Sequence, residues 1–125
     1  MEKIKIKKEK SPSNRPFLGF YITENKDYIG SLRLHEICDG YNTFIKDNLN
    51  NGLECFYIDN LWIEPKYRKK GYCKKLLEFL LKNTKGKTLF LDVVKTDEIP
   101  LKIYKMVGFG IVYTGDYTYV MKLNN

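Results

Sequence analysis

The strongest pattern of apolar and polar positions in this chain lies between residues 57 and 81. Its first part, through Ile63, is rich in β-branched and aromatic residues, which favours a strand. Pro65 ends that strand, because proline cannot donate to a sheet ladder. A loop containing Gly71 follows, and then apolar residues recur at spacings of three and four, as in an amphipathic helix. These apolar residues are Cys73, Leu76, Leu77 and Leu80. The pattern predicts a strand, a glycine loop and a helix over residues 72–83.

Shorter patterns precede this unit. Residues 3–8 alternate isoleucine with lysine, which predicts a short edge strand or a loose basic arm. Residues 17–23 and 28–37 predict a β-hairpin, with its turn at 24–27. Residues 39–52 are polar and rich in asparagine, so we expect a loop there, with at most one helical turn.

The C-terminal third alternates strand and helix signals. Residues 88–94 are nearly continuously apolar and predict a buried strand, parallel to the strand before the first helix and joined to it by a right-handed crossover. Residues 97–107 predict a second helix, with Pro100 in its first turn and Gly108 at its end. A final hairpin is expected over residues 110–114 and 117–123.

Composition narrows the class of protein. The chain has 125 residues, 43% hydrophobic and 30% charged, which predicts one folded domain over residues 1–125. No apolar run approaches the ~20 residues of a membrane span, and the first ten residues lack the apolar core of a signal peptide. We therefore expect a cytoplasmic protein that does not enter a membrane.

Cysteine and histidine usage excludes several chemistries. The three cysteines show no metal-ligand spacing, and an odd number of them favours free thiols, so no metal is expected. His35 is the only histidine, and a lone histidine in a predicted strand is more often structural than catalytic. A Ser-His-Asp or zinc hydrolase is therefore disfavoured.

The net charge of +7 implies attraction to a polyanion, either coenzyme A or a nucleic acid. Basic residues concentrate at the glycine loop, without an acid among them, where a helix N-terminus also favours phosphate. These residues are Lys66, Arg68, Lys69, Lys70, Lys74 and Lys75. No aromatic platform interleaves with them in a nucleic-acid-binding pattern, which favours coenzyme A over nucleic acid. A solvated basic helix start is the competing interpretation.

The same segment resembles the acetyl-coenzyme A motif of the GNAT superfamily of N-acetyltransferases, Leu-x-Val-x-Pro-x-x-Arg followed by Arg/Gln-x-x-Gly-x-Gly/Ala. Leu61, Ile63, Pro65 and Arg68 fall in register, followed by Gly71 and then Cys73, where the family has Gly or Ala. A second block, residues 97–109, resembles Asn-x-x-Ala-x-x-Leu-Tyr-x-x-x-Gly-Phe, with Asp97 in place of Asn and Pro100 in place of Ala.

The resemblance implies an α+β fold with a mixed, mostly antiparallel sheet, a splayed parallel pair of strands and helices packed on the sheet. The family usually places two helices between its first strand and the hairpin. Only about ten residues separate Ile6 from Phe17, so that helical pair is missing. The acceptor side should then be more open than usual, or closed by a partner subunit in a homodimer.

The resemblance also implies the site. Acetyl-coenzyme A would bind through backbone groups of the strand end and through the phosphate loop. By this resemblance, the pantetheine would be bound by Leu61, Trp62 and Ile63. The pyrophosphate would be bound by Arg68, Lys69, Lys70, Gly71, Tyr72 and Cys73. Asp97 either orients the cofactor, as the family's Asn does, or caps the second helix.

Two further residues are candidates for acid–base chemistry. Tyr104 matches the family's general acid, which protonates the departing thiolate; the competing interpretation is a packing residue. Many family members use an acid on the central strand as the base, and Asp59 is our choice. The alternative is that Asp59 only caps a turn or pairs with a lysine.

The predicted function is therefore transfer of an acetyl group from acetyl-coenzyme A to a primary amine, a protein lysine or a chain N-terminus. A small amine or polyamine is the competing acceptor. A non-catalytic module that binds coenzyme A or nucleic acid is the alternative from a different class.

Overall fold

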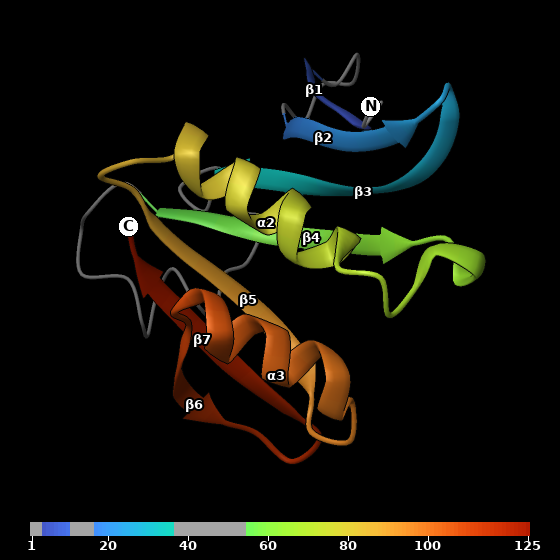
Figure 1. Ribbon diagram of the computed structural model, residues 1–125. Helices are drawn as coiled ribbons and strands as arrows, with labels where there is room; N and C mark the ends of the chain where they lie inside the picture. Colours follow the sequence, from blue (N-terminus) through green and yellow to red (C-terminus); the bar gives the residue numbers. More distant parts are fainter. Residues whose placement is uncertain (1–3, 11–16, 37–54) are drawn as a thin grey trace. The chain divides into compact units, whose positions relative to one another are not determined.

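A computed structural model describes residues 4–10, 17–36 and 55–125 (Figure 1). Its fold is mixed α+β, and its strands form a seven-stranded sheet in the order β1-β2-β3-β4-β5-β7-β6. The strands are β1 (Ile4–Lys10), β2 (Phe17–Glu24), β3 (Asp27–Glu36), β4 (Cys55–Ile63), β5 (Thr88–Val94), β6 (Gly110–Thr114) and β7 (Thr118–Asn124). The described helices are a short 3₁₀ turn, η2 (Pro65–Tyr67), and the α-helices α2 (Tyr72–Asn83) and α3 (Glu98–Val107).

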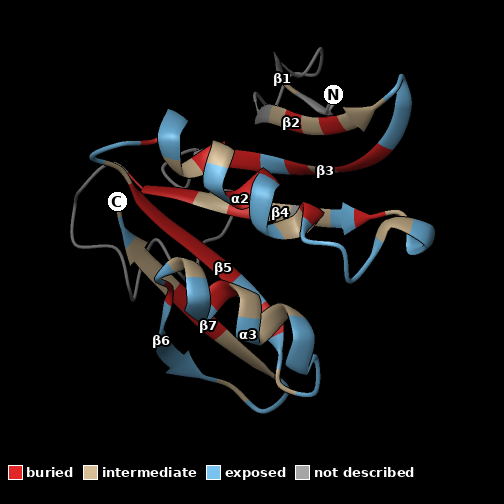
Figure 2. Cartoon of the chain, viewed as in Figure 1, coloured by how far each residue is buried: buried red, intermediate tan, exposed pale blue. Residues whose placement is uncertain are grey.

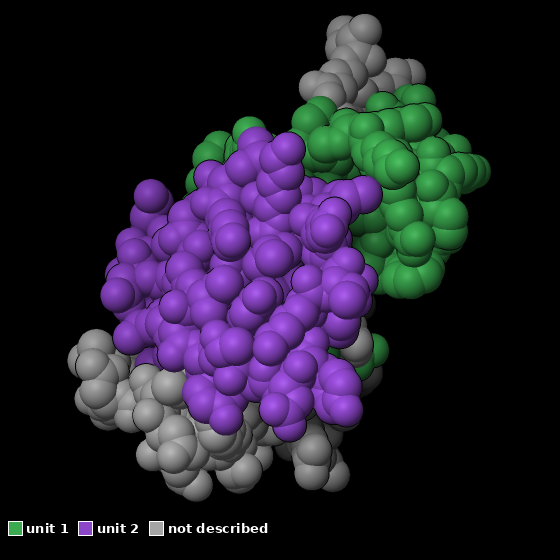
Figure 3. Space-filling view, turned by 90° about the horizontal axis from the view of Figure 1, so that it is seen from below, with its two compact units in different colours: residues 1–35, 58–83 green, residues 36–57, 84–125 purple. Residues whose placement is uncertain are grey.

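The chain divides into two compact units, coloured separately in Figure 3. The first comprises residues 1–35 and 58–83, and the second comprises residues 36–57 and 84–125. The boundary falls inside β4, so the end of that strand belongs to the first unit and its start to the second.

The first unit is built on antiparallel strands and α2. β2 and β3 form a hairpin whose two turn residues, Asn25 and Lys26, both have positive φ, as a tight two-residue turn between twisted strands requires. Phe20 of β2 is buried and meets the ring of Phe79 of α2 edge to face, with ring centroids 6.0 Å apart. Of the stripe predicted for α2, Leu76, Leu77 and Leu80 are fully buried, whereas Cys73 is intermediate in burial. Figure 2 shows buried positions along this helix.

A close approach of backbones positions the end of β4 in this unit. A Cβ atom on Gly30 of β3 would overlap the Trp62 carbonyl oxygen and the Ile63 side chain, so only glycine fits there. Nearby, the Glu64 N–H donates to the Ile29 carbonyl at 2.7 Å. The two contacts hold the end of β4 against β3.

The second unit is organised around β5. The start of β4 pairs with it in parallel, from Cys55↔Thr88 to Tyr57↔Phe90, and β7 pairs antiparallel on its other side. Leu89, Phe90 and Leu91 are buried, which explains the near-continuous apolar run in the sequence. The predicted parallel pair is confirmed.

Several boundaries differ slightly from those expected. α2 and β5 have the predicted bounds, whereas β3 begins one residue early, at Asp27, and the last strand begins at Thr118 instead of 117. β1 ends at Lys10 and β2 begins at Phe17, which leaves no room for a pair of helices between them. The loop expected at 39–52 lies outside the described residues.

Candidate active site

The glycine loop between η2 and α2 has the backbone geometry of a phosphate site. Lys69 and Gly71 both have positive φ, 63° and 86°, and α2 begins at the next residue, Tyr72. A Cβ atom built on Gly71 would meet nothing within 4 Å, so the space beside this glycine is open. The first N–H groups of α2 have no partner within the helix. Their partial positive charge and the open approach fit a phosphate group.

Arg68 is folded back from this loop onto the end of β4. Its Nε–H donates to the Ile63 carbonyl at 2.8 Å, and its guanidinium lies 4.5 Å from the centre of the Trp62 ring. The resemblance implies that backbone groups of Ile63 bind the pantetheine, but the Ile63 carbonyl already accepts a hydrogen bond from within the chain. Arg68 fastens the loop to the strand, a role the sequence motif did not reveal.

Tyr72 fastens the other side of the loop. Its side chain is buried, and its hydroxyl donates to Oε2 of Glu24 at 2.7 Å, at the end of β2. The ring of Tyr67 meets it edge to face, with centroids 5.7 Å apart. Of the groups on Tyr72, its backbone N–H is therefore the one suited to a phosphate.

The basic side chains around the loop are all exposed. Lys66 and Lys70 lie over the ring of Tyr67, at 5.1 and 6.0 Å from its centre. Lys74 approaches Glu78 at 3.9 Å, one turn along α2, and both are about half exposed. Surface pairs of this kind contribute little, so these cations stay suited to attracting a polyanionic ligand.

Cys73, at the position of the family's second glycine, carries an unreactive thiol. Burial raises the pKa of this thiol from 9.0 to about 11. The group is therefore a neutral thiol at physiological pH, and it cannot serve as a nucleophile that carries an acyl group.

Asp59, the predicted base, contacts the chain's only histidine. Nε2 of His35, on β3, lies 3.3 Å from Oδ2 of Asp59, on β4. The His35 side chain is 9% exposed and that of Asp59 24%. Burial lowers the pKa of His35 below 6.5, a shift that Asp59 opposes and Arg33 reinforces. His35 is thus one ionic partner of Asp59, and pairing of Asp59 with a lysine stays a prediction.

Tyr104 lies in α3 and Asp97 directly precedes this helix, both in the second unit. Tyr104 is buried, its ring meets Phe109 edge to face at 6.2 Å, and its carbonyl accepts from the Phe109 N–H. The helix ends at Gly108, whose φ of 114° is the left-handed conformation expected there. Asp97 occupies the N-cap position, but its side chain makes no capping hydrogen bond. Asp97 is therefore the N-cap residue, as one of the two interpretations expected, although its side chain does not satisfy a helix N–H group.

The second unit also contains a carboxylate that the sequence analysis did not single out. The Tyr57 hydroxyl donates to Oδ2 of Asp92 at 2.7 Å, beside the Tyr57↔Phe90 step of the parallel ladder. β4 continues to Ile63 and β5 to Val94 beyond that step. A lone acid in the otherwise apolar run of β5 was the available sequence signal. Splaying of the two strands stays a prediction.

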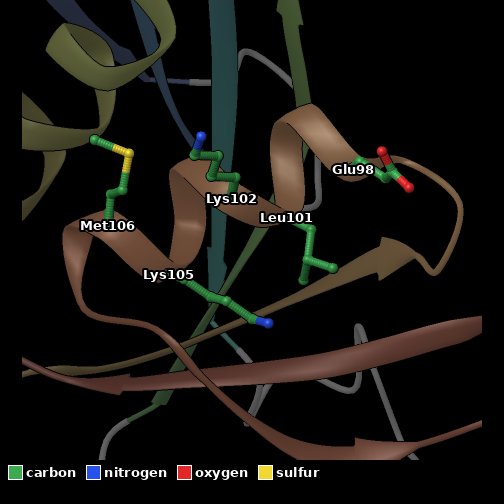
Figure 4. A pocket seen from close by; sticks show the side chains of 5 residues that line it. All are labelled: Glu98, Leu101, Lys102, Lys105 and Met106. Carbon is green, nitrogen blue, oxygen red and sulfur yellow. The ribbon is translucent and has the colours of Figure 1, made fainter.

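The described surface has a depression that contains none of these residues. It is lined by side chains of α3 alone, Glu98, Leu101, Lys102, Lys105 and Met106 (Figure 4). Their spacing places them on one side of that helix. Within the described ranges, His, Cys, Asp and Glu do not gather in groups of three or more that could hold a metal ion. None of the helices there is long and apolar enough to span a membrane.

Comparison with known proteins places the chain in a family. A sequence profile described as the Acetyltransferase (GNAT) family matches residues 2–109. The chain therefore belongs to the GNAT acetyltransferase family, and the predicted family is confirmed.

One curated protein and two solved structures are similar to this chain. Over 54 residues the chain is 38% identical to a [ribosomal protein bS18]-alanine N-acetyltransferase of Haemophilus ducreyi, which covers 41% of this chain and 37% of that protein. The chain thus matches well under half the length of this curated relative. The structure of Arabidopsis thaliana NAA60 with a bisubstrate analogue has a TM-score of 0.70 at 18% identity, covering 86% of this chain and 74% of that one.

A third similar protein is a GNAT family acetyltransferase from Elizabethkingia anophelis, solved with acetyl-CoA bound. Its TM-score is 0.71 at 13% identity, and the match covers 98% of this chain and 99% of that chain. At these identities, the two solved structures establish the fold, and with it the predicted α+β class.

Proposed function

We propose that this protein transfers the acetyl group of acetyl-coenzyme A to a primary amine of a polypeptide, a chain N-terminus or a lysine. The observation that carries the proposal is the start of α2. There Gly71 leaves open space beside helix N–H groups, and exposed lysines surround it. The pyrophosphate of coenzyme A has the charge and shape that such a site accepts.

Backbone groups supply the binding in this proposal. The N–H groups from Lys69 to Cys73 face the pyrophosphate, and the edge of Leu61 and Trp62 pairs with the pantetheine. Because Arg68 and Tyr72 already fasten the loop, it needs little ordering when the ligand arrives.

Two side chains carry the proton transfers. Asp59 takes the proton that the amine loses as its nitrogen bonds to the acetyl carbon, and Tyr104 gives a proton to the departing thiolate. An N-terminal amine has a pKa of about 7.7–8.0 and a lysine about 10.4, so the N-terminal amine deprotonates more readily. The relative named as an alanine N-acetyltransferase supports the N-terminal acceptor as the first choice.

The acceptor is tested by measuring release of coenzyme A thiol with a matched panel of amines. The panel holds a peptide with a free N-terminus and no lysine, the same peptide N-blocked with one lysine, and spermidine. Turnover of a peptide, well above hydrolysis of acetyl-coenzyme A alone, is the expected result. Turnover of spermidine alone would refute the polypeptide acceptor, and release with none of them would refute the transferase.

The general acid is tested in the same assay with Tyr104→Phe. This variant keeps the ring against Phe109, so its folding should resemble that of the parent. Loss of a positioned acid should lower kcat by roughly 10²-fold, with KM for acetyl-coenzyme A nearly unchanged. Turnover at the parental rate would make Tyr104 a packing residue.

A further inference from the structure

His35 is a buried titratable side chain in contact with the proposed base. It lies on β3, 7% exposed as a residue, and its Nε2 approaches Oδ2 of Asp59 on the neighbouring strand at 3.3 Å. The carboxylate is the more exposed partner of the two. A ligand approaching this pair therefore reaches Asp59 first, with the imidazole behind it.

We propose that His35 is a positioning residue, which holds the Asp59 carboxylate by Oδ2 in the orientation that accepts the proton of the acceptor amine. This inference rests on the proposed function. The N–H bond of the amine breaks, an O–H bond forms on Asp59, and that proton then leaves to solvent. The imidazole neither touches the substrate nor takes part in bond making.

The protonation state of His35 determines how well this residue can position the Asp59 carboxylate. Among the described residues, the charged groups that act on it are Asp59, which favours the imidazolium, and Arg33, which disfavours it. Burial outweighs Asp59, so the pKa of His35 lies below 6.5 and the ring is neutral at physiological pH. A neutral ring steadies the carboxylate without neutralising it when Nε2 carries the ring proton and turns it toward Oδ2, since the 3.3 Å approach alone is not a hydrogen bond. In acid, the imidazolium would bind the carboxylate as an ion pair and weaken it as a proton acceptor.

The test compares two substitutions of His35 in the full chain, using the acceptor peptide with the highest turnover. His35→Ala removes the contact and should lower kcat at pH 8 by about tenfold or more, with KM for acetyl-coenzyme A within about twofold of the parent. His35→Gln supplies an amide donor of similar reach that does not titrate, and it should recover most of that loss at pH 8.

The pH profile separates positioning from simple packing. The ratio of the His35→Gln rate to the parental rate, measured from pH 8 to pH 5, cancels the titration of the acceptor itself. We expect this ratio to rise by about threefold or more as the pH falls below 6.5, because only the parent acquires an imidazolium. Circular dichroism at each pH confirms that both proteins stay folded. Ile29→Val, a conservative change in the same strand at a fully buried site, controls for loss of stability.

The outcomes are distinguishable. A flat ratio, a His35→Ala variant with the parental rate, or equal losses in His35→Ala and His35→Gln would each overturn the inference and leave the transferase intact. A parental rate in Asp59→Asn would refute both the role of Asp59 as the base and the positioning role of His35. The proposed transferase activity would again be unaffected. A parent that releases no thiol with any acceptor would remove the proposed function and this inference together.

Discussion

Two glycines flank α2 in similar backbone conformations, and they allow the phosphate site to be tested against a matched control. Gly71 precedes the helix with φ of 86°, and Gly86 follows it with φ of 80°. At both positions a Cβ atom would meet nothing within 4 Å. Alanine at either therefore brings backbone strain of roughly 1–2 kcal/mol without a clash, partly offset by the smaller entropy of the unfolded chain. The net loss of unfolding free energy should be about 1 kcal/mol in both.

Binding of coenzyme A should separate the two variants. The methyl group of Gly71→Ala occupies the space through which the pyrophosphate reaches the helix N–H groups. Loss of one such charge-assisted hydrogen bond costs about 1.5–3 kcal/mol, and each 1.4 kcal/mol is tenfold in affinity. Calorimetric titration should show a dissociation constant at least about tenfold higher for Gly71→Ala, against a change within about twofold for Gly86→Ala. Urea unfolding checks that both lose similar stability.

Two results would refute this reasoning. Parental affinity in Gly71→Ala, with the expected loss of stability, would mean that no ligand approaches this glycine. Equal weakening of binding in both variants would mean that strain alone, transmitted through α2, controls affinity. Gly71→Glu extends the series, because it adds a negative charge at the same point and should abolish binding of coenzyme A.

Three further predictions concern single side chains. Tyr72→Phe removes the hydroxyl bonded to Glu24 and should lower the free energy of unfolding by about 1 kcal/mol; unchanged stability in urea would show that this bond does not fasten the loop. With a pKa of about 11, Cys73 is about one-thousandth thiolate at pH 8. Mass spectrometry should therefore find that iodoacetamide alkylates Cys73 at least ~100-fold more slowly than it alkylates a free cysteine peptide. A comparable rate would contradict the burial of this thiol. Burial lowers the pKa of His35 in the folded chain, so the unfolded chain takes up a proton on His35 at a higher pH. The free energy of unfolding therefore falls as the pH drops below about 6.5. Urea unfolding from pH 8 to pH 5 should show a shallower fall for His35→Gln, and parallel curves would contradict the shift.

Local sequence signals predicted the helices and strands near the site well, for identifiable physical reasons. The bounds of α2 follow from a strong apolar stripe between two glycines, and those of β5 from a nearly continuous apolar run. The end of α3 at Gly108 follows from the left-handed conformation that glycine adopts most easily. Each of these elements depends on residues within a few positions of one another.

The contacts of the site were not predictable in the same way. Tyr72 and Glu24 are 48 residues apart in sequence, and their hydrogen bond depends on how α2 packs against the hairpin. The contact between His35 and Asp59 depends on the register between β3 and β4. The sequence of the segment that connects these strands, residues 37–54, does not indicate that register. Similarly, the motif identifies Arg68, but not that its side chain turns back to the carbonyl of Ile63.

These long-range contacts matter most for how the loop would bind a ligand. Arg68 ties the loop to the end of β4, and Tyr72 ties it to the end of β2, both within the first unit. A loop held at both sides keeps Gly71 in its left-handed conformation without a ligand, so binding does not have to supply the ordering energy. Substitutions at Arg68 or Tyr72 should therefore weaken coenzyme A binding through the shape of the loop. Their effect on affinity would be largely insensitive to salt, whereas that of the exposed lysines would diminish as ionic strength rises, because screening acts mainly on exposed charges.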